Sequence, residues 1–105
     1  MIPIIEELEE YKTDGMHPFN EQVIYEFENG FGASVILGEH TYGLEMMLRC
    51  DDEQRIADEN DYVINQIKEL DSDLWYDVVG HMDKEKMSEL LHGIKAIKRE
   101  RGARK

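Results

Sequence analysis

The chain of 105 residues predicts a single α+β domain, with a three- or four-stranded antiparallel sheet that meanders around an Asn-Gly hairpin and C-terminal helices packed on one face. Three observations favour this fold. Two strand-like runs flank Asn29-Gly30, alternating apolar residues follow Gly43, and apolar residues at helical spacing follow Asp83. The length is typical of one domain and no linker-like gap interrupts the chain, so residues 1–105 are assigned to one domain.

The N-terminal residues 2–11 predict a short amphipathic helix. Its apolar residues recur at helical spacing between glutamates, and they are Ile4, Ile5, Leu8 and Tyr11. Pro3 suits the first turn of such a helix, because its missing N–H would have no partner there. Residues 13–20 contain a glycine and a proline and predict a loop.

The strongest local signal is a hairpin of residues 23–28 and 31–37 around Asn29-Gly30. A two-residue Asn-Gly connection predicts a type I′ turn, in which both residues have positive φ. Such a turn places Glu28 opposite Phe31 and Phe27 opposite Gly32. The ring of Phe27 would then cover the bare backbone of the glycine.

A third antiparallel strand is expected after the glycine-bracketed turn of residues 38–43. Leu44, Met46, Leu48 and Cys50 alternate there with Glu45, Met47 and Arg49. Residues 51–60 are polar and acidic, and they are compatible with a loop or a frayed helix. The apolar run within residues 62–67 is compatible with a fourth strand or the start of a helix, because it is too short to separate the two.

Two helices are expected near the C-terminus. Residues 70–79 show helical spacing of apolar residues behind possible N-caps in residues 71–73, and Gly80 would end this helix. Asp83 is a favourable N-cap for the last helix, whose apolar positions are Met87, Leu90, Leu91, Ile94 and Ile97. The basic tail 99–105 has little to bury and is expected to fray.

No pattern in the sequence predicts catalysis, a cofactor or a metal site, so we expect a protein that is not an enzyme. The four histidines, His17, His40, His81 and His92, have no second ligand at metal-binding spacing. The acidic runs at residues 51–53 and 71–73 lack the glycine and glutamate of a calcium loop. The glycines at positions 30 and 32 lie within a hairpin, whereas a phosphate-binding loop joins a strand to a helix.

The sequence predicts a cytoplasmic protein that does not bind membranes. No apolar run reaches the length of about 18 residues that a membrane-spanning helix needs, and the N-terminus lacks the pattern of a signal peptide. The single cysteine, Cys50, is consistent with a reducing compartment, and we interpret it as a small strand hydrophobe.

The charge pattern predicts a protein partner with a basic surface. The net charge is −12, and residues 1–94 hold 23 acids and 6 bases, whereas residues 95–105 hold 6 bases and 1 acid. A body this negative repels nucleic acid and lipid headgroups and attracts basic surfaces. The basic C-terminal residues are also compatible with self-association as a homo-oligomer.

The acidic segment of residues 51–77 holds ten acids and two bases and is the candidate binding surface. A row of carboxylates can occupy a basic groove built for the phosphates of DNA, although an acidic face also simply keeps a protein dissolved. We expect Trp75 in the core and Tyr76 at the surface. The predicted partner-binding residues are Asp51, Asp52, Glu53, Asp58, Glu59, Asp61, Asp71, Asp73, Tyr76 and Asp77.

Two segments resemble a family of small uncharacterised bacteriophage proteins. Residues 29–35 match its N-G-[YF]-G-A-S-V hairpin, and residues 77–82 match a D-V-[LV]-G-x-[LM] stretch before its final helix. The resemblance implies the fold and a phage origin and brings no catalytic residues, and the chain departs from the family pattern between residues 51 and 72. By analogy, the predicted function is inhibition of a host defence or nucleic-acid enzyme in the host cytoplasm, and the alternative is a homo-oligomeric structural or assembly accessory.

Overall fold

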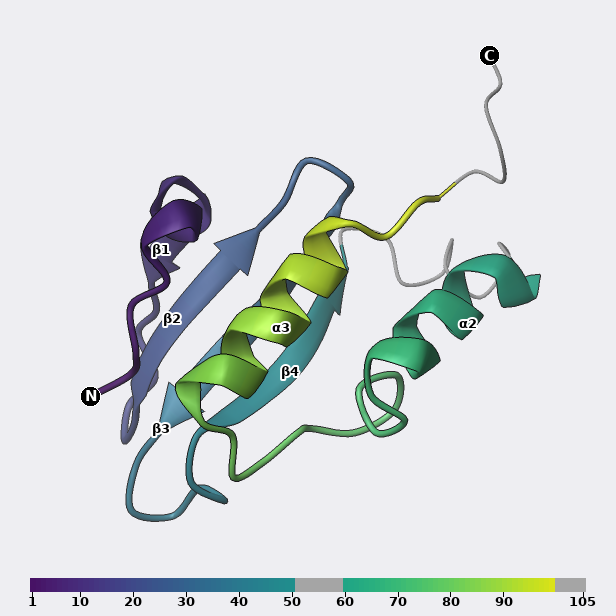
Figure 1. Cartoon of the computed structure of the whole chain (residues 1–105). Coiled ribbons are helices and arrows are strands. Elements are labelled where there is room, and N and C mark those ends of the chain that lie inside the picture. The colour runs from purple at the N-terminus through teal and green to yellow at the C-terminus, as the bar shows by residue number, and fades with distance from the viewer. Residues whose placement is uncertain (51–59, 100–105) are drawn as a thin grey trace.

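The computed structural model describes residues 1–50 and 60–99 and has an α+β fold, as predicted. A four-stranded antiparallel sheet has the order β1-β2-β3-β4, and α3 lies along one of its faces while α2 lies beside it, beyond β4 (Figure 1). The elements are η1 (Glu6–Tyr11, a 3₁₀ helix), β1 (Lys12–Asp14), β2 (Glu21–Glu26), β3 (Phe31–Leu37), β4 (Glu45–Cys50), α2 (Asn60–Leu70) and α3 (Lys84–Lys95). Within the described residues, no helix is long and apolar enough to cross a membrane.

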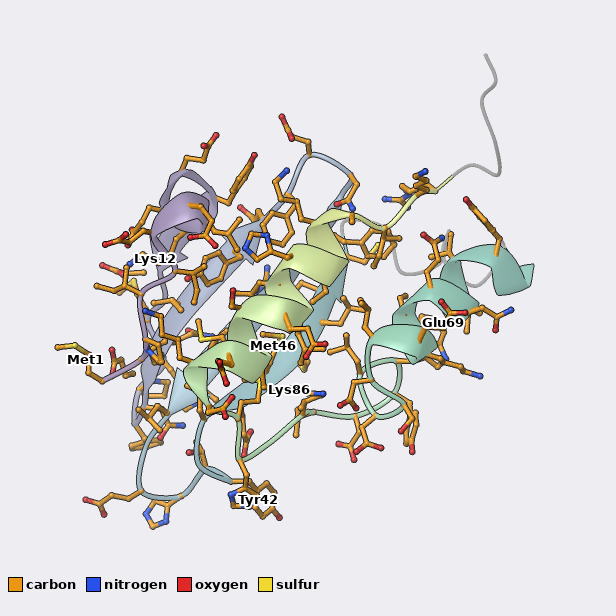
Figure 2. The ribbon with its side chains drawn as sticks, viewed as in Figure 1. Met1, Lys12, Tyr42, Met46, Glu69 and Lys86 are labelled. Atoms are coloured by element: carbon orange, nitrogen blue, oxygen red, sulfur yellow. The ribbon has the colours of Figure 1, made fainter. Side chains whose placement is uncertain are left out.

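The core lies between α3 and the sheet face that α3 covers. Alternate residues of the central strands, among them Tyr25, Val35 and Met46, are fully buried on this face. Figure 2 shows Met46 beneath α3. The helix contributes the apolar residues that its spacing predicted, Met87, Leu90, Leu91 and Ile94. Its N-cap is Asp83, as expected, and the Asp83 carboxylate accepts the Lys86 N–H at 2.7 Å.

The predicted two-residue hairpin turn is wrong, and the turn has three residues, 28–30. Phe27 pairs with Phe31, whose carbonyl accepts the Phe27 N–H at 2.8 Å, and the Phe27 carbonyl accepts the Gly30 N–H at 3.1 Å. Of the three turn residues, only Gly30 has a positive φ, 86°. A type I′ turn needs positive φ at both of its central residues, so this turn is not type I′. The strands are therefore shifted by one residue from the predicted pairing, and Gly32 lies opposite Glu26.

The physical reason for this register is the position of the Asn29 side chain. Asn29 Nδ2 donates to the carbonyls of Ile94, Lys95 and Ile97, at 2.9, 3.1 and 3.0 Å, and so satisfies the C-terminal end of α3. In this register Tyr25 lies opposite Ala33 and Val23 opposite Val35, and all four side chains are buried on the face that α3 covers. A contact between residues far apart in sequence therefore decides the turn.

The helix predicted over residues 70–79 is also wrong beyond Leu70. Residues 71–77 form a series of turns, and Val79 then pairs with Met46 at the edge of β4 through two hydrogen bonds of 2.8 and 2.9 Å. Pairing at the sheet edge suits the β-branched residues Val78 and Val79 better than a helix does. The apolar run in residues 62–67 belongs to α2, which settles the choice between strand and helix.

The N-terminal region differs from the prediction in two ways. The helix begins at Glu6, so Pro3 precedes it and Ile4 is exposed. The fourth strand is β1, within a segment where a loop was expected from residue 13 onward, and Thr13 pairs there with Ile24. The choice between loop and helix for residues 51–60 falls outside the described residues, except that α2 begins at Asn60. Of the basic tail, Arg99 is described, and its guanidinium lies over the Phe31 ring, 4.9 Å from the centroid.

Candidate functional site

The predicted partner-binding residues fall into three groups. Asp51, Asp52, Glu53, Asp58 and Glu59 lie outside the described residues, and Asp61 belongs to α2. The other four lie in residues 71–77, the turn segment that joins α2 to the Val79 bridge, and they are Asp71, Asp73, Tyr76 and Asp77. These four residues are the predicted contacts that the structure brings into one described segment.

The turn segment is ordered by its own main chain and by its carboxylates. The Asp77 N–H donates to the Asp73 carbonyl at 2.8 Å, and the Leu74 N–H donates to the Asp71 carbonyl at 3.1 Å. Asp71 Oδ1 accepts the Asp73 N–H, and Asp77 Oδ1 accepts the Val78 N–H. The Leu74 side chain is buried and anchors the segment to the core. These hydrogen bonds are typical of aspartates in turns and fix the positions of the acids.

The structure separates Asp71 from the other acids. Asp71 Oδ2 lies 3.2 Å from Lys86 Nζ, and the Asp71 side chain is only 19% exposed. Figure 2 shows Lys86 on α3, beside the chain that follows α2. Asp71 therefore ties the turn segment to α3 and has little capacity to contact a partner.

Asp73, Tyr76 and Asp77 form an exposed acidic cluster. Asp73 and Asp77 are both exposed, and Tyr76, which lies between them in the sequence, is 73% exposed. The Tyr76 hydroxyl lies 3.4 Å from Asp73 Oδ1 and donates a long hydrogen bond to it. An exposed aromatic residue is thus bonded to one carboxylate and followed in the chain by a second.

A groove of about 440 Å³ lies between β4 and two residues of this cluster, Tyr76 and Asp77. One wall is formed by residues 47–50 and the other by residues 74–78. Met47 is 51% exposed and projects from the sheet face opposite α3. Trp75 is half-buried in the other wall, so the prediction that it belongs to the core is only partly correct.

Arg49 lines this groove and a second cavity of about 300 Å³, which also contacts Glu26, Glu28 and Gly32. Its side chain is exposed, and within the described residues it makes no ion pair. Sequence reasoning missed both Met47 and Arg49. Their alternation with buried residues predicts that they point away from the core, but only the fold shows that residues 74–78 run beside them.

The open face of the sheet, opposite α3, carries a mixture of polar and apolar residues. Neither α2 nor α3 covers it, because α3 lies on the other face and α2 lies beyond β4 (Figure 1). By register, this face includes Ile24, Ser34, Ile36, Glu45 and Met47. Ser34 and Glu45 are buried by their neighbours, whereas Ile24 and Ile36 are half-buried.

The histidines have separate surroundings in the described part of the chain. His92 Nε2 lies 2.8 Å from Glu7 Oε2 and joins α3 to η1, and this hydrogen bond lowers the pKa of Glu7. His17 accepts the Phe19 N–H in the loop before β2, and the ring of His81 lies beside Tyr42. Within the described residues, no three side chains of metal-binding type gather.

Comparisons with protein-family models, with curated proteins and with solved structures found no match to this chain.

Proposed function

We propose that this protein is a small acidic binding domain that masks a basic surface of another protein. The contact is made by the acidic cluster (Asp73, Tyr76 and Asp77) and the groove beside it. The single observation that carries the proposal is an exposed tyrosine at the rim of a groove, hydrogen-bonded to the exposed carboxylate of Asp73 and next in the chain to the exposed Asp77.

The composition of the groove supports a protein partner. Tryptophan, tyrosine, methionine and arginine are enriched in protein–protein interfaces, and Trp, Tyr and Arg supply most of the residues that dominate binding energy. Trp75, Tyr76, Met47 and Arg49 all line this one groove. The same residues scattered over the surface would not indicate a binding site, since single exposed apolar side chains are common.

The charge supports a basic partner. Asp73 and Asp77 offer carboxylates that are not neutralised by an ion pair within the described residues. The whole chain carries a net charge of −12, which accelerates encounter with a positive surface. Both effects weaken as salt is added, because exposed charges are screened within about 8 Å at physiological ionic strength.

The proposal extends to a phage-encoded inhibitor acting in the cytoplasm of the host. Its support is the resemblance of the hairpin to small bacteriophage proteins, together with the acidity of the chain. The target would be a host defence or nucleic-acid enzyme whose basic groove otherwise holds DNA, and the acids of residues 51–61 add to the negative charge of the chain. The protein would contact no nucleic acid or membrane itself.

Affinity purification from host lysate tests the proposal with matched variants. Tyr76→Ala and the pair Asp73→Asn with Asp77→Asn alter the acidic cluster, and each asparagine retains an oxygen that can accept the same hydrogen bond, from the Tyr76 hydroxyl or the Val78 N–H. The control pair Glu10→Gln with Glu39→Gln removes the same charge at exposed positions that line none of the described cavities.

We expect wild type and the control pair to retain the same partner, and both cluster variants to lose it. Retention should also fall steeply between low and high salt. If the cluster variants retain the partner as well as wild type does, or if salt has no effect, the proposed surface is wrong.

A second candidate function is a structural or assembly accessory that acts as a homo-oligomer. The observation that favours it is the open sheet face, where Ile24, Ile36 and Met47 offer apolar area that no described helix covers. Two copies could pack these faces against each other. Light scattering at high protein concentration separates the two functions, because a strict monomer excludes this one.

A further inference from the structure

The edge of β4 has main-chain groups that no described residue pairs with. The Phe27–Phe31 pair closes the hairpin, so residues 31, 33 and 35 direct their N–H and C=O groups toward β2, and residues 32, 34 and 36 direct theirs toward β4. Glu45, Met47 and Arg49 therefore bond to β3. Met46 and Leu48 direct their main-chain groups the other way, out of the sheet edge.

The Met46–Val79 bridge confirms this direction, and it also shows where the edge pairing ends. Continuing the same antiparallel register would place Asp77 opposite Leu48. Asp77 instead donates its N–H to the Asp73 carbonyl, and the chain turns away from β4. Within the described residues, the outward N–H and C=O of Leu48 have no protein partner.

An unpaired strand edge of this kind readily accepts another strand. The Leu48 edge lies in the groove between β4 and residues 74–78, and its volume of about 440 Å³ falls within the usual range for binding sites. Tyr76 and Asp77 of the acidic cluster line the opposite wall. A chain that bonded to Leu48 would therefore run past the Asp77 carboxylate and the Tyr76 ring, whose hydroxyl is hydrogen-bonded to Asp73.

We propose that the groove binds an extended segment of the partner that carries lysine or arginine and adds to β4 at Leu48 as a short strand. The inference rests on the proposed function and specifies how the partner binds. Main-chain hydrogen bonds to Leu48 supply affinity, and a basic side chain contacts the acidic cluster, where Tyr76 also offers a ring face to the cation.

The test uses a synthetic hexapeptide, acetyl-Lys-Val-Lys-Val-Lys-Val-amide, with the full-length protein at low salt. Two control peptides of equal charge carry N-methyl groups on the three lysine amides or on the three valine amides. Alternate amides of a strand face opposite edges, so each control removes the donors of one edge only. Binding is followed by NMR titration, and amide hydrogen exchange is measured at Leu48.

The parent peptide should slow exchange of the Leu48 amide. One methylated peptide should bind about tenfold more weakly than the other, because about 1.4 kcal/mol is within reach of one or two hydrogen bonds. Asp73→Asn with Asp77→Asn should weaken binding of the parent peptide about threefold or more, whereas Glu10→Gln with Glu39→Gln should not.

Three results would overturn the inference. They are equal binding by both methylated peptides with unchanged Leu48 exchange, failure of the parent peptide to bind at millimolar concentration, and protection of Leu48 by a second copy of the protein without peptide. If the first result is found but the cluster variants still lose the partner from lysate, only the strand addition at Leu48 is wrong and the acidic docking surface is kept. If the cluster variants retain the partner in lysate, the proposed function itself is wrong.

Discussion

The two faces of the sheet differ in what their side chains contact. On the face under α3, Tyr25, Val35 and Met46 are fully buried in one apolar core. On the opposite face, Met47 and Arg49 are exposed and line cavities, although they lie next to Met46 and Leu48 in the same strand. The covered face provides stability, and the open face leaves side chains available for binding. The predictions below test that division, from the largest expected effect to the smallest.

Met46 and Met47 form a matched pair, because they are the same residue type at adjacent positions on opposite faces. Met46→Ala removes a fully buried side chain and should lower the free energy of unfolding by about 2–5 kcal/mol. Met47→Ala truncates a half-exposed side chain and should cost less than about 1 kcal/mol. Urea unfolding measures both. Equal costs would mean that the open face is packed as tightly as the covered one.

Asn29 should contribute more to the free energy of unfolding than a turn residue usually does, because its side chain bonds to the end of the helix on the covered face. Asn29→Ala removes the donor to three carbonyls at the end of α3 and the acceptor of the Phe31 N–H. We expect a loss of about 1–3 kcal/mol in the free energy of unfolding. Asn29→Gly is the informative control, because glycine suits any turn but cannot replace the side-chain contacts. A glycine variant as stable as wild type would show that turn conformation alone matters.

Tyr25 is the weak point of the covered face, since its hydroxyl is buried without a hydrogen-bond partner among the described residues. Tyr25→Phe should therefore be neutral or raise the free energy of unfolding by up to about 1 kcal/mol. Burial, and secondarily the charge of Glu9, raises the pKa of Tyr25 above its ordinary value of 10.0.

Because the pKa of Tyr25 is raised, the difference in stability between wild type and Tyr25→Phe should depend on pH. Above pH 10 the unfolded tyrosine ionises while the folded one stays neutral, so wild-type stability should fall as pH rises past the ordinary pKa. The phenylalanine variant should lack this component of the alkaline loss. Chemical unfolding at a series of pH values measures the difference, and identical alkaline slopes would contradict the burial of the hydroxyl.

The contact between Glu7 and His92 should have the smallest effect, because both side chains are largely exposed. The hydrogen bond from His92 is the main cause of the lowered pKa of Glu7. A lowered pKa contributes stability above the ordinary value of 4.5, and this contribution is lost as pH falls through the folded pKa. Glu7→Gln should therefore slightly reduce the acid sensitivity of unfolding, measured below pH 4.5. If the dependence of unfolding on pH in this acid range is the same in Glu7→Gln as in wild type, the contact is not formed in solution.

Local patterns predicted much of the fold. Alternation located β3 and β4, and apolar spacing with the Asp83 cap located α3. The errors arose where a distant contact overrides a local preference. Asn29-Gly30 favours a two-residue turn, but the Asn29 side chain bonds to α3, and residues 74–79 have helical spacing, but Val79 bonds to Met46.

The candidate site could also be predicted only in part. Asp73, Tyr76 and Asp77 could be chosen from local composition, since aromatic residues among acids are unusual. Asp71 could not be separated from them, because its neutralisation by Lys86 depends on how α3 docks. Met47 and Arg49 could not be found either, since their role depends on which segment lies beside β4 and on which face the helix leaves open.

The bonds from Asn29 to the carbonyls of residues 94, 95 and 97 also constrain the order of events during folding. The final strand pairing gains these bonds only after the chain as far as residue 97 has been made and its last helix has docked. A free peptide of residues 21–37 lacks the carbonyls, so we expect it to populate the pairing with the two-residue turn, in which Phe27 lies opposite Gly32. Cross-strand nuclear Overhauser effects from Phe27 to Gly32 in that peptide would reveal it.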